Sequence, residues 1–121
     1  MACDFRIAVD SAKLTVAFAK VGLSGDYGAC YFLTQLVGPA KAKELLMFSP
    51  LLTAEQALEL GLVHRVYPPG LFQEQTNAFV QALATGPSVA LGNIKMNVNL
   101  AARTDFRTSV DAEAMYQVRS M

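Results

Sequence analysis

Three short stretches of the chain have the residue types of β-strands. Residues 6–9 and 13–18 are apolar and rich in β-branched side chains, and the Asp10-Ser11 pair between them has the composition of a turn. Residues 63–67 form a third such stretch, which ends at Pro68-Pro69 because proline cannot donate a hydrogen bond to a sheet. The pattern predicts two short strands at the start of the chain and one short extended piece later.

Between these stretches the apolar positions recur with helical spacing after Gly25. Gly38-Pro39 predicts the end of one helix and the start of another over residues 39–48, because proline at the first helical position gives up no needed N–H group. Thr53-Ala-Glu-Gln56 is a capping-box sequence, and Gly61 supplies a residue suited to a left-handed helix end. We expect a capped helix between them.

The rest of the chain is predicted to be helical. One helix has Phe72, Phe79 and Leu83 on a single face and ends at Gly86-Pro87. Two more helices are expected over residues 88–102 and 106–119. Four apolar residues of the first of these are available for burial: Val89, Ile94, Val98 and Ala101. Since no repeat or long linker divides the chain, residues 1–121 are expected to form a single domain with one core.

Composition narrows the class of protein. Hydrophobic residues make up 53% of the 121 residues and charged residues 17%, which favours contact of some apolar surface with another chain. Ten basic residues balance ten acidic ones without a basic cluster, so nucleic acid is not an expected partner. No apolar run is long enough for a membrane span and no secretory leader is visible, so we expect a soluble, cytoplasmic protein.

Cysteine and histidine offer little chemistry. Cys3 and Cys30 lack the spacing of a metal site or a redox pair, and we interpret them as buried thiols without a disulfide. His64 is the single histidine, which excludes a multi-histidine metal site or a histidine-paired nucleophile within the chain. Ser24 has no base beside it and lacks the spacing of a nucleophile elbow.

Asp26 is the best acid/base candidate. It lies between Gly25 and Gly28 at the start of an apolar helix, where free N–H groups favour a negative charge and glycines allow backbone geometries that a Cβ would hinder. An Asp acting as a helix N-cap would explain the same spacing. Both interpretations remain open on local grounds.

Five segments, in order, resemble the crotonase superfamily, the enoyl-CoA hydratase/isomerase family. They are Cys3-Asp4-Phe5-Arg6-Ile7-Ala8, then Val21-Gly22-Leu23-Ser24-Gly25-Asp26, then Tyr31-Phe32-Leu33 with Leu36-Val37-Gly38, then Ala40-Lys41-Ala42-Lys43-Glu44-Leu45, and finally Ala54-Glu55-Gln56-Ala57 with Gly61-Leu62-Val63. The resemblance implies an α/β crotonase-like (ClpP/crotonase) fragment with two or three short strands followed by mainly α-helices. The resemblance also implies that a complete family member is about twice as long as this chain. It therefore implies a C-terminal half, in which residues 1–66 end the spiral core and residues 67–121 form a helical oligomerisation region.

The same resemblance implies an acyl-CoA substrate, no cofactor, no metal and a homo-oligomer of the family's trimer or hexamer type. Hydratases of the superfamily use two glutamates, of which the first would precede Met1 and the second would fall at Phe18. Asp26 matches the position of the catalytic Asp of isomerase-type members. Phe18, Leu23 and Tyr27 are candidate substrate contacts. Isomerisation is therefore favoured over hydration.

Two expectations qualify this interpretation. The oxyanion-hole donors of the family would lie upstream of Met1, and loss of one such donor typically costs about 100- to 1,000-fold in rate, so we expect the chain alone to be inactive. The alternative function is a non-catalytic association module, a pseudoenzyme or fragment whose helices carry subunit contacts.

Overall fold

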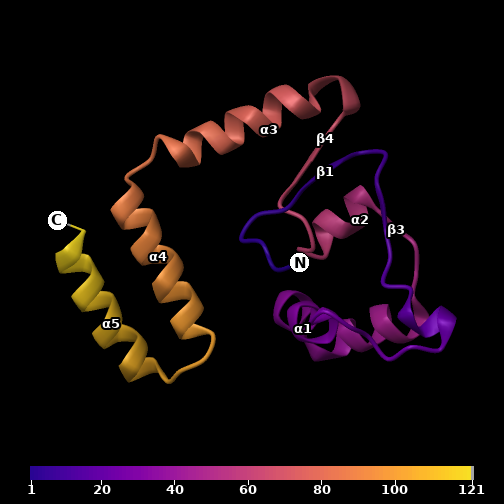
Figure 1. The fold of residues 1–121 in the computed structure, drawn as a ribbon, viewed down its shortest axis with the longest axis horizontal. Coiled ribbons are helices and arrows are strands. Elements are labelled where there is room, and N and C mark those ends of the chain that lie inside the picture. Colours follow the sequence, from indigo (N-terminus) through magenta and orange to yellow (C-terminus); the bar gives the residue numbers. More distant parts are fainter. Residues whose placement is uncertain (121) are drawn as a thin grey trace. The chain divides into compact units, whose positions relative to one another are not determined.

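A computed structural model describes residues 1–120, which form two compact units. The first unit comprises Met1–Thr76 and contains all the strands, and the second begins at Asn77 and is helical. The helix α3, Pro69–Ala84, runs from one unit into the other (Figure 1). None of the helices within residues 1–120 combines the length and the hydrophobicity that a membrane crossing requires.

The first unit holds two small sheets. Strand β1, Ile7–Val9, pairs in parallel with β4, Arg65–Tyr67, so that Ile7 is opposite Arg65 and Val9 is opposite Tyr67. Strand β2, Lys13–Leu14, pairs antiparallel with β3, Leu52–Thr53. The predicted extended pieces near residues 6–9 and 63–67 are confirmed.

The second predicted strand is much shorter than residues 13–18. Its partner β3 has only two residues, so the ladder ends at Leu14. Phe18 instead begins the 3-10 turn η1, Phe18–Val21, which ends at Gly22 with a left-handed φ of 73°. The expectation that Phe18 belongs to a strand is therefore wrong.

The helix break and the helix ends predicted from neighbouring residues are confirmed. Helix α1, Ala29–Phe48, is broken at Gly38, where φ is 75° and ψ is 165°, and resumes at Pro39 as predicted. Helix α2, Ala54–Glu59, has the full capping box, in which Thr53 Oγ1 accepts from the Gln56 N–H at 3.2 Å and Gln56 Oε1 accepts from the Thr53 N–H at 2.9 Å. Gly61 follows with φ of 74°.

The core of the first unit lies between α1, α2 and the segment after α2. Six buried apolar residues form one cluster: Leu33, Ala42, Leu45, Ala57, Leu62 and Val63. The break at Gly38 allows both halves of α1 to contribute, since Leu33 precedes it and Leu45 follows it. Each of the four strands places a partly buried apolar residue against this core: Ala8, Leu14, Leu52 and Val66.

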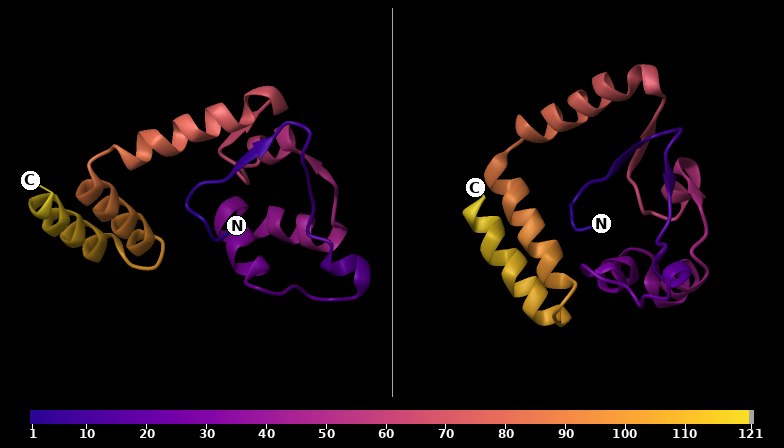
Figure 2. Two further views of the ribbon diagram at one scale, coloured as in Figure 1. Left: turned by 45° about the horizontal axis from the view of Figure 1, so that its top comes forward. Right: turned by 45° about the vertical axis from the view of Figure 1, so that its right-hand side comes forward.

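The second unit contains α4, Ser88–Ala101, and α5, Phe106–Arg119, which match the predicted ranges closely. The two helices lie side by side and antiparallel (Figure 2). The face of α4 with reduced exposure includes Asn93 and Asn97, and Asn93 Nδ2 donates to Ser120 Oγ at 2.8 Å and to the Tyr116 carbonyl at 3.4 Å.

The predicted burial of Val89, Ile94, Val98 and Ala101 is not found, because these residues lie off the face of α4 that meets α5. Val89 is 61% exposed and Val98 is 64% exposed. The prediction of buried cysteines is also wrong. Cys3 and Cys30 are exposed free thiols. Cys30 lies in the first turn of α1, with its Sγ 3.7 Å from the Ser24 carbonyl oxygen.

Candidate active site

A shallow hollow of about 350 Å³ in the first unit contains Asp26 in its lining. We call it the Asp26 hollow. Its walls come from the start of the chain, the segment leading into η1, and the beginning of α1. The lining residues are Met1, Ala2, Thr15, Val16, Ala17, Phe18, Asp26, Tyr27, Ala29 and Phe32. Three of the four candidate site residues, Phe18, Asp26 and Tyr27, thus line one hollow.

The loop before α1 has an unusual backbone. Gly25, Tyr27 and Gly28 all have positive φ, of 113°, 50° and 75°. A Cβ on Gly28 would lie 3.0 Å from Cε2 of Phe32, so glycine avoids both the strain of the left-handed conformation and a close contact with the Phe32 ring. The backbone freedom expected of Gly25 and Gly28 is confirmed.

Asp26 does not cap α1 with its side chain. The N-cap is Gly28, and no side-chain hydrogen bond caps the helix. Asp26 Oδ1 instead accepts from the adjacent Tyr27 N–H at 2.7 Å, and the Asp26 carbonyl accepts from the Ala29 N–H at 2.9 Å. The carboxylate is exposed. The N-cap interpretation therefore lacks the hydrogen bond that defines it.

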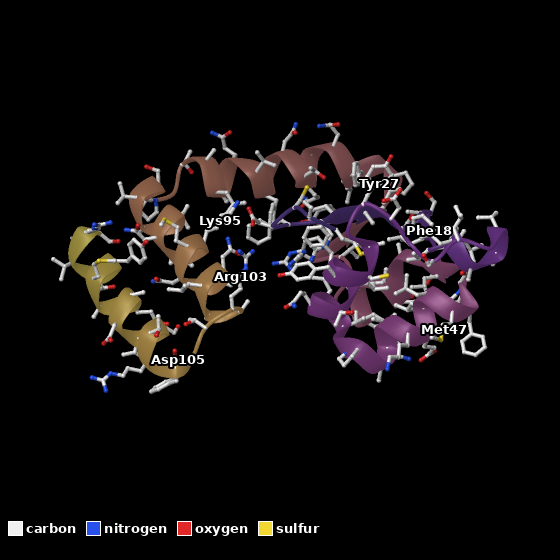
Figure 3. All side chains as sticks on the ribbon, turned by 60° about the horizontal axis from the view of Figure 1, so that its bottom comes forward. Phe18, Tyr27, Met47, Lys95, Arg103 and Asp105 are labelled. Atoms are coloured by element: carbon white, nitrogen blue, oxygen red, sulfur yellow. The ribbon has the colours of Figure 1, made fainter. Side chains whose placement is uncertain are left out.

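Phe18 and Tyr27 contribute aromatic surface to the Asp26 hollow and lie at the same end of the first unit (Figure 3). Phe18 is half-buried, whereas the Tyr27 side chain is 93% exposed. An apolar wall beside a carboxylate favours a ligand with an apolar part over a wholly polar one. Phe18 offers no group able to orient or deprotonate water.

Leu23 is not part of this hollow. It follows η1, is 60% exposed, and its N–H donates to the Phe18 carbonyl at 3.0 Å. Sequence reasoning missed Thr15, Val16 and Phe32, which do line the hollow. Phe32 could have been noticed because it lies four positions after Gly28, one turn along the predicted helix.

The remaining chemical candidates have structural surroundings. His64 Nδ1 accepts from the Arg6 N–H at 3.2 Å, and its ring meets Phe5 edge-on at a centroid distance of 5.4 Å. The Arg6 guanidinium donates to the carbonyls of Leu62 and Cys3, both at 2.6 Å. Among the described residues no group of three His, Cys, Asp or Glu side chains is placed to hold a metal ion.

Comparison with known proteins identifies the class. A match to the family described as enoyl-CoA hydratase/isomerase covers residues 1–121. The chain belongs to the enoyl-CoA hydratase/isomerase family, within the crotonase superfamily.

Individual proteins and solved structures are similar to most of this chain. The chain is similar to a short-chain-enoyl-CoA hydratase of Clostridioides difficile, with 37% identity over 114 residues that make up 94% of this chain and 74% of that protein. It is 36% identical to a 1,2-epoxyphenylacetyl-CoA isomerase of Escherichia coli K12 over 94% of this chain and 44% of the relative. An enoyl-CoA hydratase structure from Polaromonas sp. JS666 matches 98% of this chain and 46% of its own, with 30% identity and a TM-score of 0.90.

These figures also give the extent of the match. The chain spans about three quarters of the Clostridioides relative and less than half of the Escherichia coli and Polaromonas ones. The fold expected from the sequence, a crotonase-like fragment of short strands followed by mainly helices, is confirmed.

Proposed function

We propose that this chain is the C-terminal half of a crotonase-fold protein that acts on acyl-CoA thioesters, and that it favours double-bond isomerisation over hydration. The observation that carries the proposal is the carboxylate of Asp26, exposed on an apolar hollow and bound by one N–H rather than used as a helix cap. In this proposal Asp26 is the general acid/base, Phe18 and Tyr27 contact the acyl chain, and Leu23 has a weaker claim to such contact. No metal or redox cofactor is needed for this chemistry.

A single carboxylate is sufficient for a 1,3-proton shift. Asp26 would take a proton from C2 of a 3-enoyl thioester, which leaves a dienolate, and would return the proton to C4 to give the 2-enoyl thioester. Hydration also requires a group that orients and deprotonates water, and Phe18 cannot do this. The dienolate requires hydrogen-bond donors at the thioester oxygen. We propose that those donors come from a part of the fold outside these 121 residues.

The test measures isomerisation of a 3-enoyl-CoA and hydration of crotonyl-CoA by the natural polypeptide that contains this chain. Asp26→Asn should lower isomerisation of a 3-enoyl-CoA by about 100-fold or more, since it removes a general base. Helix content and Tm should stay almost unchanged, because the carboxylate caps nothing. Asp10→Asn, which changes an exposed carboxylate in the β1–β2 turn, is the matched control and should retain full activity.

Three results would contradict the proposal. Isomerase activity that survives within a fewfold in Asp26→Asn would remove Asp26 from the chemistry. Crotonyl-CoA hydration faster than isomerisation would reverse the preferred reaction. A turnover above about 1 per second by the 121 residues alone would show that no further segment is needed.

The second candidate function is a non-catalytic association module. It is favoured by large apolar side chains of α4 and α5 that remain exposed, such as Val98 at 64%, Phe106 at 84% and Val118 at 72%. We propose residues 67–121 as the oligomerisation region, with a homo-oligomer as the product. Light scattering at tens of micromolar tests this, and a monodisperse monomer that binds no hydrophobic dye would refute it.

A further inference from the structure

The loop before α1 contains a tight turn that begins at Asp26. The Asp26 carbonyl accepts from the Ala29 N–H at 2.9 Å, which closes a turn with Tyr27 and Gly28 at its centre. Both central residues have positive φ, 50° for Tyr27 and 75° for Gly28. Positive φ at both central positions is the mark of a type I′ turn, which favours asparagine followed by glycine. The chain has the favoured glycine but a tyrosine in place of the asparagine.

The conformation of Tyr27 is unusual for its residue type. A left-handed backbone is unfavourable for residues that carry a Cβ. Within residues 1–120, only Tyr27 and Ser49 have positive φ without being glycine. Ser49 is the C-cap of α1 and its N–H donates to the Leu45 carbonyl, so the end of that helix accounts for its conformation. The Tyr27 side chain is 93% exposed, so burial of the ring does not account for the conformation of Tyr27.

The turn orients one peptide group, the one that joins Asp26 to Tyr27. Its carbonyl oxygen accepts from the Ala29 N–H, and its N–H donates to Asp26 Oδ1 at 2.7 Å. The second of these bonds has the length of a charge-assisted hydrogen bond to a carboxylate. If Tyr27 left the left-handed region, the turn would open and this peptide group would rotate, which would turn its N–H away from Asp26.

The contact matters because the Asp26 side chain is exposed and lies on the wall of the Asp26 hollow. An exposed carboxylate rotates about its side-chain bonds unless a hydrogen bond restrains it. Proton transfer requires the reacting atoms to be aligned, and a misplacement of about 1 Å can lower the rate about 100-fold. The Tyr27 N–H restrains Oδ1, which leaves Oδ2 to exchange a proton with a substrate.

We propose that Tyr27 is a positioning residue for the isomerisation and acts through its backbone. Its left-handed conformation closes the turn, and the N–H of the oriented peptide group holds Asp26 Oδ1. Oδ2 then takes the proton from C2 of the 3-enoyl thioester, the electron pair of that C–H bond passes into the dienolate, and Oδ2 returns the proton to C4. The inference rests on the proposed function, and it is separate from the acyl contact proposed for the Tyr27 ring.

Two variants of similar size separate the backbone of Tyr27 from its ring. Tyr27→Asn and Tyr27→Val both remove the ring, but asparagine is suited to the left-handed position of a type I′ turn and a β-branched valine is not. In the natural polypeptide, kcat of Tyr27→Asn for a 3-enoyl-CoA should exceed that of Tyr27→Val by about tenfold or more, the effect of a hydrogen bond to a charged group. KM should change equally in both variants, because both lack the ring.

Gly22→Ala is the control for backbone strain alone. Gly22 has φ of 73° and ends η1, and it does not line the Asp26 hollow. This variant should lose stability but keep the wild-type kcat. Far-UV circular dichroism and thermal unfolding establish that each variant is folded at the assay temperature. If Tyr27→Val does not fold, Tyr27→Gly and Tyr27→Ala provide the same comparison, with kcat at least about threefold higher for the glycine variant.

A kcat for Tyr27→Val within about twofold of that for Tyr27→Asn would overturn the proposal, even if Tyr27→Val has a lower Tm, because the turn would then be only structural. Equal kcat values for Tyr27→Gly and Tyr27→Ala would overturn it in the same way. A loss of kcat in Gly22→Ala as large as that in Tyr27→Val would also overturn it. Undiminished isomerisation in Asp26→Asn would refute the proposed function together with this inference. A large loss in Asp26→Asn with equal rates for the paired Tyr27 variants would refute this inference alone.

Discussion

Replacement of Gly28 by alanine tests whether the loop before α1 is shaped by backbone conformation alone or also by its packing against Phe32. Gly28 has φ of 75°, and a left-handed conformation costs an alanine about 1–2 kcal/mol. The new Cβ would also lie 3.0 Å from Cε2 and 3.2 Å from Cδ2 of Phe32, so the ring must shift. Overpacking of this kind adds about 1 kcal/mol where the neighbouring group can move.

Gly22→Ala is the matched control. Gly22 has φ of 73°, but a Cβ there would meet nothing within 4 Å. It should lose about 1–2 kcal/mol from the conformation alone. Gly28→Ala should lose about 2–3 kcal/mol, the sum of both effects. The difference between the two variants therefore measures the contact with Phe32.

Urea unfolding followed by far-UV circular dichroism gives both free energies. Equal slopes against denaturant are needed for the comparison, because a changed slope would mean that a different amount of surface unfolds. If the two variants differ by less than about 0.3 kcal/mol, Phe32 does not restrain the loop, and the shape of the Asp26 hollow must be set elsewhere.

Three further predictions use other parts of the chain. Thr53→Ala should destabilise the first unit by about 1 kcal/mol in urea unfolding because it removes half of the capping box, whereas Thr53→Ser should restore most of that loss. The Thr108 backbone N–H and hydroxyl, which donate to the Asp105 carboxylate at 3.1 Å and 2.8 Å, lower the pKa of Asp105. A lowered folded pKa stabilises above the unfolded pKa, so wild type should have a higher Tm than Asp105→Asn at neutral pH, and the difference should disappear as the pH falls through the folded pKa; a constant difference would contradict this. Cys3 and Cys30 should both react with a thiol reagent in the absence of denaturant, and a single reactive thiol per chain would show that one is covered.

Sequence predicted those features that depend on neighbouring residues. The capping box at Thr53 and the helix break at Gly38 each involve groups within about one helical turn, so local chemistry decides them. The start of α5 after Asp105 follows the same rule, since Asp105 accepts from the Thr108 N–H. These elements appear at the predicted positions.

Features that depend on distant partners were predicted less well. The strand expected to continue to Phe18 ends at Leu14 because its partner is only two residues long. The apolar residues Val89 and Val98 were expected to be buried, but α5 packs on the side of α4 that carries Asn93. In both cases the local pattern indicated an apolar strand or helix. It did not show which other element would pack against that strand or helix, or on which side.

The candidate site also combines local features that the sequence predicts with non-local features that it does not predict. The position of Asp26 among Gly25 and Gly28 was evident from the sequence, and the structure adds that its carboxylate accepts from the Tyr27 N–H rather than from the helix. The presence of Phe32 and Thr15 on the same hollow depends on the path of the chain before η1. The pattern of apolar and polar residues in the sequence does not predict the path of the chain there.

The parallel pairing of β1 with β4 has a consequence for synthesis of the protein. His64 and Arg6, which flank the two strands, are 58 positions apart. At about 5–20 residues per second, translation leaves β1 outside the ribosome for about 3–12 s before β4 can follow it. During that interval β1 lacks the one strand neighbour it has in the folded unit. A nascent chain of this kind should therefore be a substrate for chaperones that shield extended apolar segments until residue 67 has emerged.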